Sequence, residues 1–148
     1  MAWNVIRVLY ENYDMDKREA EDLLDFVAMA TVCDVMSLTG ENRILVKEGL
    51  KRIRHTKNIG LQALMQACNV QPENISAYHF GYVLGPCVNA TGRLDTARHA
   101  LRLFETGQET EAEEIARDLV DLNQERKELT LQGVEMAKKL CELSLIHI

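Results

Sequence analysis

Residues 85–93 read GPCVNATGR and combine the residue types in this chain that best suit the binding of an anion. Glycine allows positive φ and lets another group approach the backbone closely. Proline stops a preceding helix. Asn89 and Arg93 add side-chain donors, so the stretch predicts a shaped loop that holds a phosphate oxygen. Composition alone favours a simpler alternative, a helix–helix connection with Asn89 and Gly92 as turn residues.

Asp34 is the second candidate, because it ends a run that is apolar on nearly every side. The run from Leu23 to Val32 predicts a helix buried all round. A carboxylate in such surroundings is costly unless it is paired, hydrogen-bonded or bound to a metal. The alternative for a single Asp is an exposed helix end, or a bond to a nearby hydroxyl.

The elements that carry these residues all show helical periodicity, and the sequence predicts an all-α fold. A first helix is expected over residues 1–13. A second begins near Lys17, after a cap at Asp16, and continues through the apolar run. An amphipathic helix over 43–55 presents lysines and arginines, and Asn58 caps a short helix after it. Residues 73–84 form another helix that ends at Gly85-Pro86. His79 lies there and is expected to be a packed residue.

Two further helices follow residues 85–93. The first places Leu94, Ala97, Leu101 and Phe104 on its inner face. The second begins near Glu109 and carries a seven-residue apolar repeat, broken by Arg126 and Gly133. Some 33 residues of helix would span roughly 50 Å, which exceeds what one small domain covers. This helix should therefore project, pair with a partner, or join another domain.

The composition suits one globular domain with a real core in 148 residues. No apolar run reaches the roughly 18 residues of a membrane helix, so no membrane partner is expected. The four cysteines are far apart and predict free, buried thiols in a reducing cytosol, in preference to disulfides or a zinc site. The net charge of −6 divides into −6 over residues 1–42, +6 over 43–102 and −6 over 103–148. A basic centre suits a phosphate-rich partner, although a solvated helix face has the same composition.

Two segments together resemble a known family. Residues 24–43, LDFVAMATVCDVMSLTGENR, resemble the fourth motif of the RecJ single-strand-specific exonucleases, which are DHH phosphoesterases. Residues 85–95 resemble the next block of that family, GPRINAAGRL, and LNQERK at 122–127 also fits. The likeness runs from about residue 1 to 142.

The resemblance implies a metal-dependent 5′–3′ exonuclease that hydrolyses single-stranded DNA in repair and recombination, in the cytoplasm of a bacterium. It assigns Asp34 as a ligand of a catalytic Mn²⁺ or Mg²⁺, which overrides the exposed alternative above. It places Asn89 and Arg93 in a block that contacts the nucleic-acid backbone. Single-strand-binding or helicase proteins are the partners it implies for a longer parent protein.

The same resemblance predicts how the chain is organised. Residues 1–105 would form the C-terminal helical part of a DHH core, 106–142 a linking helix, and 143–148 (LSLIHI) a non-native tail similar to a translated sequencing adapter. The aspartate-rich first motifs and the Asp-His-His triplet would precede residue 1, so the chain should be inactive alone. Cys87 and Ser37 depart from the family, which often has Arg and Pro there.

Two other functions fit the residues. The chain could be a helical protein-interaction module that uses its long heptad helix, or another DHH phosphoesterase acting on short oligonucleotides.

Overall fold

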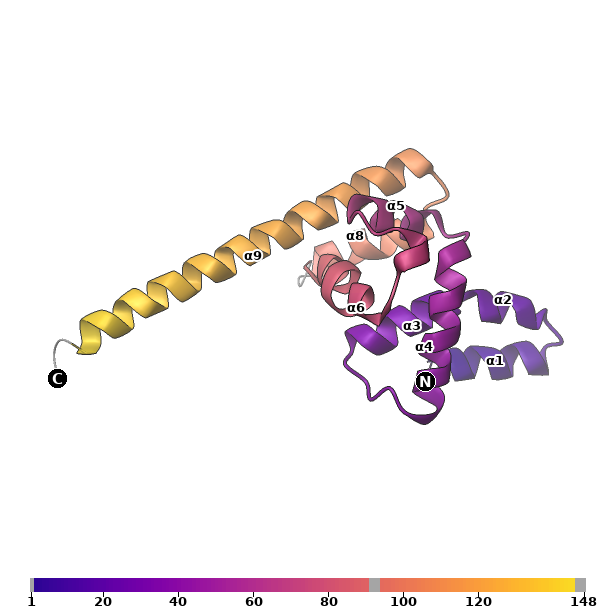
Figure 1. The fold of residues 1–148 in the computed structure, drawn as a ribbon. Helices are drawn as coiled ribbons and strands as arrows, with labels where there is room; N and C mark the ends of the chain where they lie inside the picture. Colours follow the sequence, from indigo (N-terminus) through magenta and orange to yellow (C-terminus); the bar gives the residue numbers. More distant parts are fainter. Residues whose placement is uncertain (1, 91–93, 146–148) are drawn as a thin grey trace.

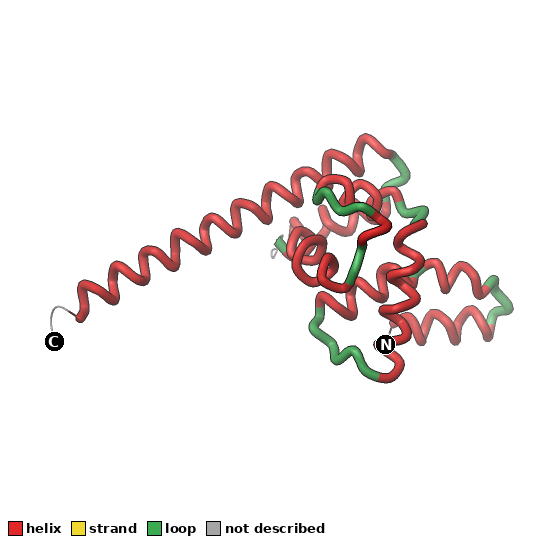
Figure 2. The backbone as a smooth tube through the Cα atoms, viewed as in Figure 1, coloured by secondary structure: helices red, strands yellow, loops and turns green. Residues whose placement is uncertain are grey.

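The computed structural model describes residues 2–90 and 94–145, without the side chains of 94–96 and 143–145. This part of the chain consists of helices and connecting turns and contains no strand (Figure 2), which confirms the all-α prediction. A helical body carries one long helix that projects away from it (Figure 1). The pair α1 and α2 lies at the end of the molecule opposite the free end of that helix.

The N-terminal hairpin consists of α1 (Ala2–Asn12) and α2 (Lys17–Asp22). The expected cap is present, because the Asp16 carboxylate accepts the backbone N–H of Arg18 at 2.9 Å. Trp3 Nε1 donates to the carbonyl of Ala20 at 2.8 Å and holds the two helices together.

The prediction of a second helix that continues through the apolar run is wrong in one respect. The helix is interrupted at Leu23, and a separate helix, α3 (Leu24–Cys33), follows. The break turns the apolar run away from α2 and onto α4 (Gly40–Arg52). Gly49 makes this crossing close, since a Cβ there would meet the carbonyl oxygen of Leu24 and the Cβ of Ala28. A short η1 (Ile53–His55) extends α4, and Ile53 is fully buried.

The prediction that α3 is buried on every side is also wrong for this chain. Leu24, Ala28 and Met29 are buried, whereas Ala30 is exposed and Val27 and Val32 are half-buried. The reason is geometric, because the helices of the described chain cover only part of α3's surface.

The centre of the body is built by short elements, which pack against α3 and against the last two helices of the chain. These are α5 (Ile59–Ala67), η2 (Pro72–Asn74), α6 (Ala77–His79), the π-helical η3 (Phe80–Leu84) and α7 (Gly85–Asn89). Asn58 caps α5 as expected, with its side-chain oxygen 2.9 Å from the N–H of Leu61. His79 Nδ1 accepts the N–H of Ser76 at 3.1 Å and so caps α6.

The expected break at Gly85-Pro86 does not occur, and residues 77–89 form one helical run. A π turn precedes the proline: the N–H of Gly85 bonds the carbonyl of Phe80, five residues back. Pro86 occupies the first turn of α7, the position in a helix that best tolerates a proline, and the π turn before it is of the kind found as single turns within helices. The predicted anion loop is therefore helical through Asn89, and residues 91–93 lie outside the described part.

The last two helices are α8 (Leu94–Glu105) and α9 (Glu109–Leu145). The predicted inner face of α8 is rotated, since Ala97 and Leu101 are exposed while Ala100 and Leu103 are buried. Phe104 is half-buried and meets Phe26 edge to face, with ring centroids 5.2 Å apart. Asn58 Nδ2 also donates to the Phe104 carbonyl at 2.8 Å.

The long helix α9 has two different halves. Ala112, Ile115, Ala116 and Leu119 are buried against α5 and α8 and belong to the core. Residues 124–142 are exposed throughout, and this half extends into solvent (Figure 1). At 1.5 Å per residue the whole helix spans about 55 Å, as the sequence led us to expect.

Candidate nucleic-acid interface

A small hollow of about 220 Å³ lies where three separated segments meet. The end of α3, the helical run 77–89 and the middle of α9 contribute to it. Its lining consists of Cys33, Gly81, Gly85, Pro86, Asn89 and Arg126. Of the three residues predicted from the sequence, Asn89 lines this hollow and Asp34 directly follows a residue that lines it.

Gly85 explains how the end of α3 reaches the helical run. A Cβ at this position would meet the Sγ of Cys33 and the carbonyl oxygen of Phe80. The Cys33 thiol itself donates to the Phe80 carbonyl at 3.3 Å, and burial raises the pKa of that thiol. The glycine is therefore needed for a close approach of two helices, rather than for the loop that its type suggested.

Arg126 is the residue that sequence reasoning missed. It projects from α9 into the hollow, and its Nη2 donates to Asn123 Oδ1 at 3.0 Å. Asn123 is 4% exposed, and its Nδ2 donates to Cys87 Sγ at 3.5 Å, so it links α9 to α7 and orients the guanidinium. Among the described side chains Arg126 forms no ion pair, which leaves most of its donors for a ligand. The interruption of the apolar repeat at Arg126 was the available signal.

Cys87, the thiol that Asn123 contacts, has an altered pKa. The Sγ atoms of Cys68 and Cys87 lie 3.8 Å apart. The pKa of Cys87 is lowered to about 7, first by the hydrogen bond from Cys68 and then by Asn123 Nδ2 and the charges of Lys127 and Arg126, against the effect of burial. The pKa of Cys68 is raised, because its proton is held in that bond and because burial disfavours its thiolate. Of the two thiols, Cys87 is therefore the one that loses its proton first.

Asp34 does not have the buried environment that its sequence context predicted. It caps α3, its N–H bonds the Ala30 carbonyl at 2.9 Å, and its side chain is exposed. Val35, the next residue, has φ of 54° and is 89% exposed. A β-branched residue in this left-handed region is strained, and such strain occurs preferentially at functional sites. The uncovered part of α3 ends at this carboxylate, so the residues that the structure describes do not supply the surroundings expected for Asp34.

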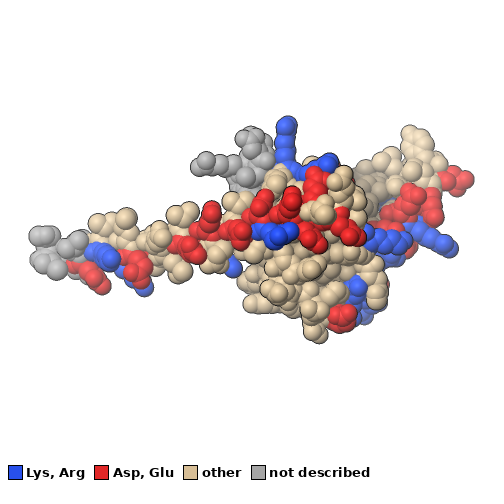
Figure 3. Space-filling view, turned by 90° about the horizontal axis from the view of Figure 1, so that it is seen from above, with Lys and Arg blue, Asp and Glu red and all other residues tan. Residues whose placement is uncertain are grey.

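The predicted basic surface of α4 is partly neutralised. Arg52 pairs with Glu21 and with Asp22, the latter at 3.4 Å, and Lys51 pairs with Glu48 at 2.7 Å. Arg43, Lys47 and Arg54 remain and line a hollow of about 480 Å³ with Leu38, Val46 and Leu50. The opposite sign prevails elsewhere: the face of α9 seen in Figure 3 is covered by Asp and Glu side chains. A polyanion is therefore expected to approach another face of the molecule.

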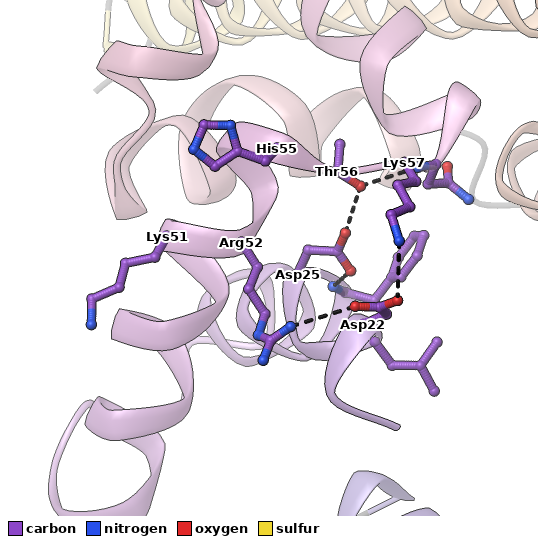
Figure 4. Close-up of a pocket in the computed structure, with 10 residues that line it drawn as sticks. Asp22, Asp25, Lys51, Arg52, His55, Thr56 and Lys57 are labelled. Carbon is purple, nitrogen blue, oxygen red and sulfur yellow. Dashed lines mark hydrogen bonds and ion pairs between the residues drawn. The ribbon is translucent and has the colours of Figure 1, made fainter. Parts of the chain in front are cut away.

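Another hollow, of about 500 Å³, is structural in character (Figure 4). Asp22 faces Arg52 and Lys57 across it, at 3.4 and 4.0 Å. Asp25, 3% exposed, accepts the hydroxyl of Thr56 and the N–H of Phe26, both at 2.7 Å. Burial raises the pKa of Asp25, and the two hydrogen bonds partly oppose this effect. Asp22 thus engages the cations Arg52 and Lys57 of this hollow, and the bonds of Asp25 tie α3 to the end of η1.

The described residues contain no group of three or more His, Cys, Asp or Glu side chains that could hold a metal ion. None of the helices in residues 2–90 and 94–145 is long and apolar enough to span a membrane. The four cysteines are thiols outside any disulfide, as predicted, although Cys141 is exposed and Cys33 and Cys68 are only half-buried.

Comparison with known proteins shows that this chain is similar to part of a class of nucleases. No protein-family model matches the chain. It is 42% identical over 123 residues to the single-stranded-DNA-specific exonuclease RecJ of Escherichia coli strain K12. It is 40% identical over 123 residues to that of Haemophilus influenzae, and 32% over 122 residues to that of Bacillus subtilis strain 168. Each match covers 82% of this chain.

Solved structures give the same result. Crystal structures of RecJ from Thermus thermophilus, in complex with Mg²⁺ and with Mn²⁺, superpose with a TM-score of 0.79 at 33% identity over 93% of this chain. The resemblance to the RecJ exonucleases is thereby confirmed in sequence and in fold. The chain spans about a fifth of their length, since it covers 21% of the Escherichia coli protein and 21% of the Mg²⁺-bound Thermus chain.

Proposed function

We propose that this chain acts as one segment of a metal-dependent, single-stranded-DNA-specific 5′–3′ exonuclease of the DHH phosphoesterase class. Within that enzyme it would hold the DNA backbone at the hollow between α7 and α9 and supply one metal ligand, Asp34. The observation that carries this proposal is the convergence of Asn89 and Arg126 at that hollow, in a chain similar to RecJ.

The hollow has the chemistry that a phosphodiester requires. Arg126 presents a planar set of donors, which match two oxygens of one phosphate. Asn89 adds an exposed amide from the end of α7. Gly81 and Gly85 also line the hollow, and their missing side chains let Val32 and Cys33 of α3 pack against this wall. We propose that Arg93, which lies outside the described residues, adds a further phosphate contact from the segment that follows Asn89.

We propose that other parts of the parent enzyme supply most of the metal ligands. Asp34 is exposed, and the described residues contain no cluster that could hold a divalent ion with it. The residues present thus do not fit a complete metal site, and Asp34 would be one ligand among several. We therefore expect the isolated chain not to hydrolyse DNA.

A chimera tests the proposal. The chain would replace its matching segment in the Escherichia coli relative, and Mn²⁺-dependent release of nucleotides from single-stranded DNA would be measured. Asp34→Asn should reduce turnover at least ~100-fold, because loss of a metal ligand removes charge stabilisation worth several kcal/mol. Glu73→Gln, an exposed carboxyl on η2, is the matched control and should retain activity.

Two results would contradict the proposal. The first is full turnover by the Asp34→Asn chimera while the unmodified chimera is active. The second is Mn²⁺-dependent hydrolysis by the isolated chain, because Asp34 would then not depend on ligands from elsewhere.

A second candidate function, protein interaction, is favoured by the free half of α9. Leu129, Leu131 and Met136 are 67%, 65% and 67% exposed there. Apolar side chains at this exposure on a projecting helix suit a partner helix or another domain of the same protein. Sedimentation of the isolated chain would show self-association if a second copy covers this face.

A further inference from the structure

Two exposed tyrosines lie on the helical run 77–89, whose last residue, Asn89, lines the hollow proposed to hold a phosphate. Tyr78 and Tyr82 are 62% and 72% exposed, and their rings stack with centroids 5.1 Å apart and planes 26° from parallel. The edge of the His79 ring supports the pair, with an interplanar angle of 86° to Tyr78. The three rings thus pack against one another, while both tyrosines stay largely exposed.

The tyrosines and the hollow share one face of one helical run. Tyr78, Tyr82, Pro86 and Asn89 follow one another at intervals of four, four and three residues, which is the spacing of a helix face. The run is continuous through α6, η3 and α7, so these side chains form a track of about 16 Å. Gly81, between the two tyrosines, lines the hollow itself.

The two ends of this track differ in chemistry. One end offers flat aromatic surface. The other offers Asn89 and the Arg126 guanidinium, with the charge of Lys127 close enough to lower the pKa of Cys87. Unpaired nucleic acid has the matching pair of features, a base that stacks and a phosphate that carries charge. A duplex does not fit as well, because its bases stack on one another and do not expose their faces.

We propose that Tyr78 and Tyr82 form a base-stacking platform for single-stranded DNA, placed so that the adjoining phosphate enters the hollow of Asn89 and Arg126. This inference rests on the proposed function and specifies how that site distinguishes single strands from duplexes. It also assigns a binding role to two side chains that the sequence presents only as part of a helix.

The test compares two oligonucleotides of about 12 nucleotides, within the usual range of single-strand site sizes. One is oligo(dT), and the other has the same phosphates with every base replaced by an abasic spacer. Fluorescence anisotropy with the full 148-residue chain gives both affinities. Stacking contributes about 1–3 kcal/mol per base, so oligo(dT) should bind about 5- to 150-fold more tightly than the abasic strand.

Variants assign that difference to the platform. The double variant Tyr78→Ala/Tyr82→Ala should lower the affinity for oligo(dT) to that for the abasic strand, whereas Tyr78→Phe/Tyr82→Phe should retain it because a phenyl ring also stacks. Tyr13→Ala is the matched control, since Tyr13 is 74% exposed on the distant N-terminal hairpin, and it should change neither affinity. Circular dichroism melting confirms that each variant is folded.

Arg126→Ala separates this inference from the proposed function. It should weaken the binding of both strands alike and lower the salt slope of binding by about 0.7, the value for one phosphate contact.

Equal affinity for both strands, or unchanged oligo(dT) binding by the folded double Ala variant, overturns the platform and leaves the phosphate site standing. No binding of either strand, or no effect of Arg126→Ala, overturns the phosphate site of the proposed function. If the tyrosines are instead covered by protein, the double Ala variant keeps full affinity, which also overturns the platform.

Discussion

At the scale of single residues, Asp25 is the charged group most strongly constrained by the fold. Its carboxylate is buried at the start of α3 and bonded to Thr56 and to the backbone of Phe26 (Figure 4). Its sequence position, between Leu24 and Phe26 in an apolar run, gave no sign of these partners, because Thr56 lies 31 residues away. A buried acid of this kind makes the stability of the fold depend on pH.

The sign of that dependence follows from the raised pKa of Asp25, whose ordinary value is 3.8. The protonated form is favoured in the folded state, so its stabilisation is present at low pH and is lost as the pH rises through the raised pKa. We expect the free energy of unfolding of the wild type, relative to Asp25→Asn, to fall with pH above about 3.8 and then to become constant. Urea titrations at a series of pH values measure this difference.

The exposed acid Asp121 on α9 supplies the control for this experiment. Asp121→Asn should leave the shape of the pH curve unchanged. A difference between wild type and Asp25→Asn that rises with pH would show that the hydrogen bonds outweigh burial and that the pKa is lowered instead.

At the scale of elements, the sequence was most informative where a local signal decides the outcome. Asp16 and Asn58 cap helices as predicted, because an N-cap bond joins residues two or three apart. The prediction failed where packing decides. Gly85-Pro86 continues a helix by means of a π turn, and α8 buries Leu103 rather than Leu101, because α5 and α9 select its inner face.

The candidate site shows the same division. Asn89 could be predicted because its sequence block is distinctive. Arg126 could not be placed, since only the path of α9 brings it to α7, 37 residues earlier in the chain. The exposure of Asp34 depends on what covers α3, and that information is not contained in the local sequence.

The crossing of α3 and α4 gives a prediction at this scale. Gly49→Ala places a methyl group against the Leu24 carbonyl and the Ala28 side chain, and helix backbones cannot yield as a flexible side chain can. We expect a loss of about 3 kcal/mol in the free energy of unfolding, at the upper end of typical overpacking costs. Chemical denaturation monitored by circular dichroism measures it.

Gly107→Ala is the matched substitution, because a Cβ at Gly107 would meet no atom within 4 Å and its φ is not positive. Its effect should stay within about 0.5 kcal/mol. If Gly49→Ala is equally mild, the close packing of α3 on α4 is wrong.

At the scale of the whole molecule, α9 begins in the compact body and continues beyond it as a long exposed helix. Its first half is part of the core through Ala112, Ala116 and Leu119, so the helix is more than a linker. Asn123 and Arg126 lie where it leaves the body, at the hollow proposed to hold a phosphate. This arrangement means that whatever binds the free half of α9 is rigidly connected to the proposed DNA site. The predicted division at residue 105 stays a prediction, with the first turns of α9 packed in the body.

Two truncations test this division of α9. A chain that ends at Thr130 loses, among the described side chains, only exposed ones, so its melting temperature should be unchanged, equivalent to less than about 0.5 kcal/mol. A chain that ends at Asp121 loses half-buried Leu122, buried Asn123 and the cation of the hollow. It should melt at a lower temperature and lose affinity for the abasic strand, because both the link to α7 and the phosphate donor are removed. Differential scanning calorimetry and anisotropy measure the two effects.

The chain ending at Thr130 could instead melt at a lower temperature, while the melting temperature of the full chain depends on protein concentration. That result would mean that the free half of α9 is buried against a second copy.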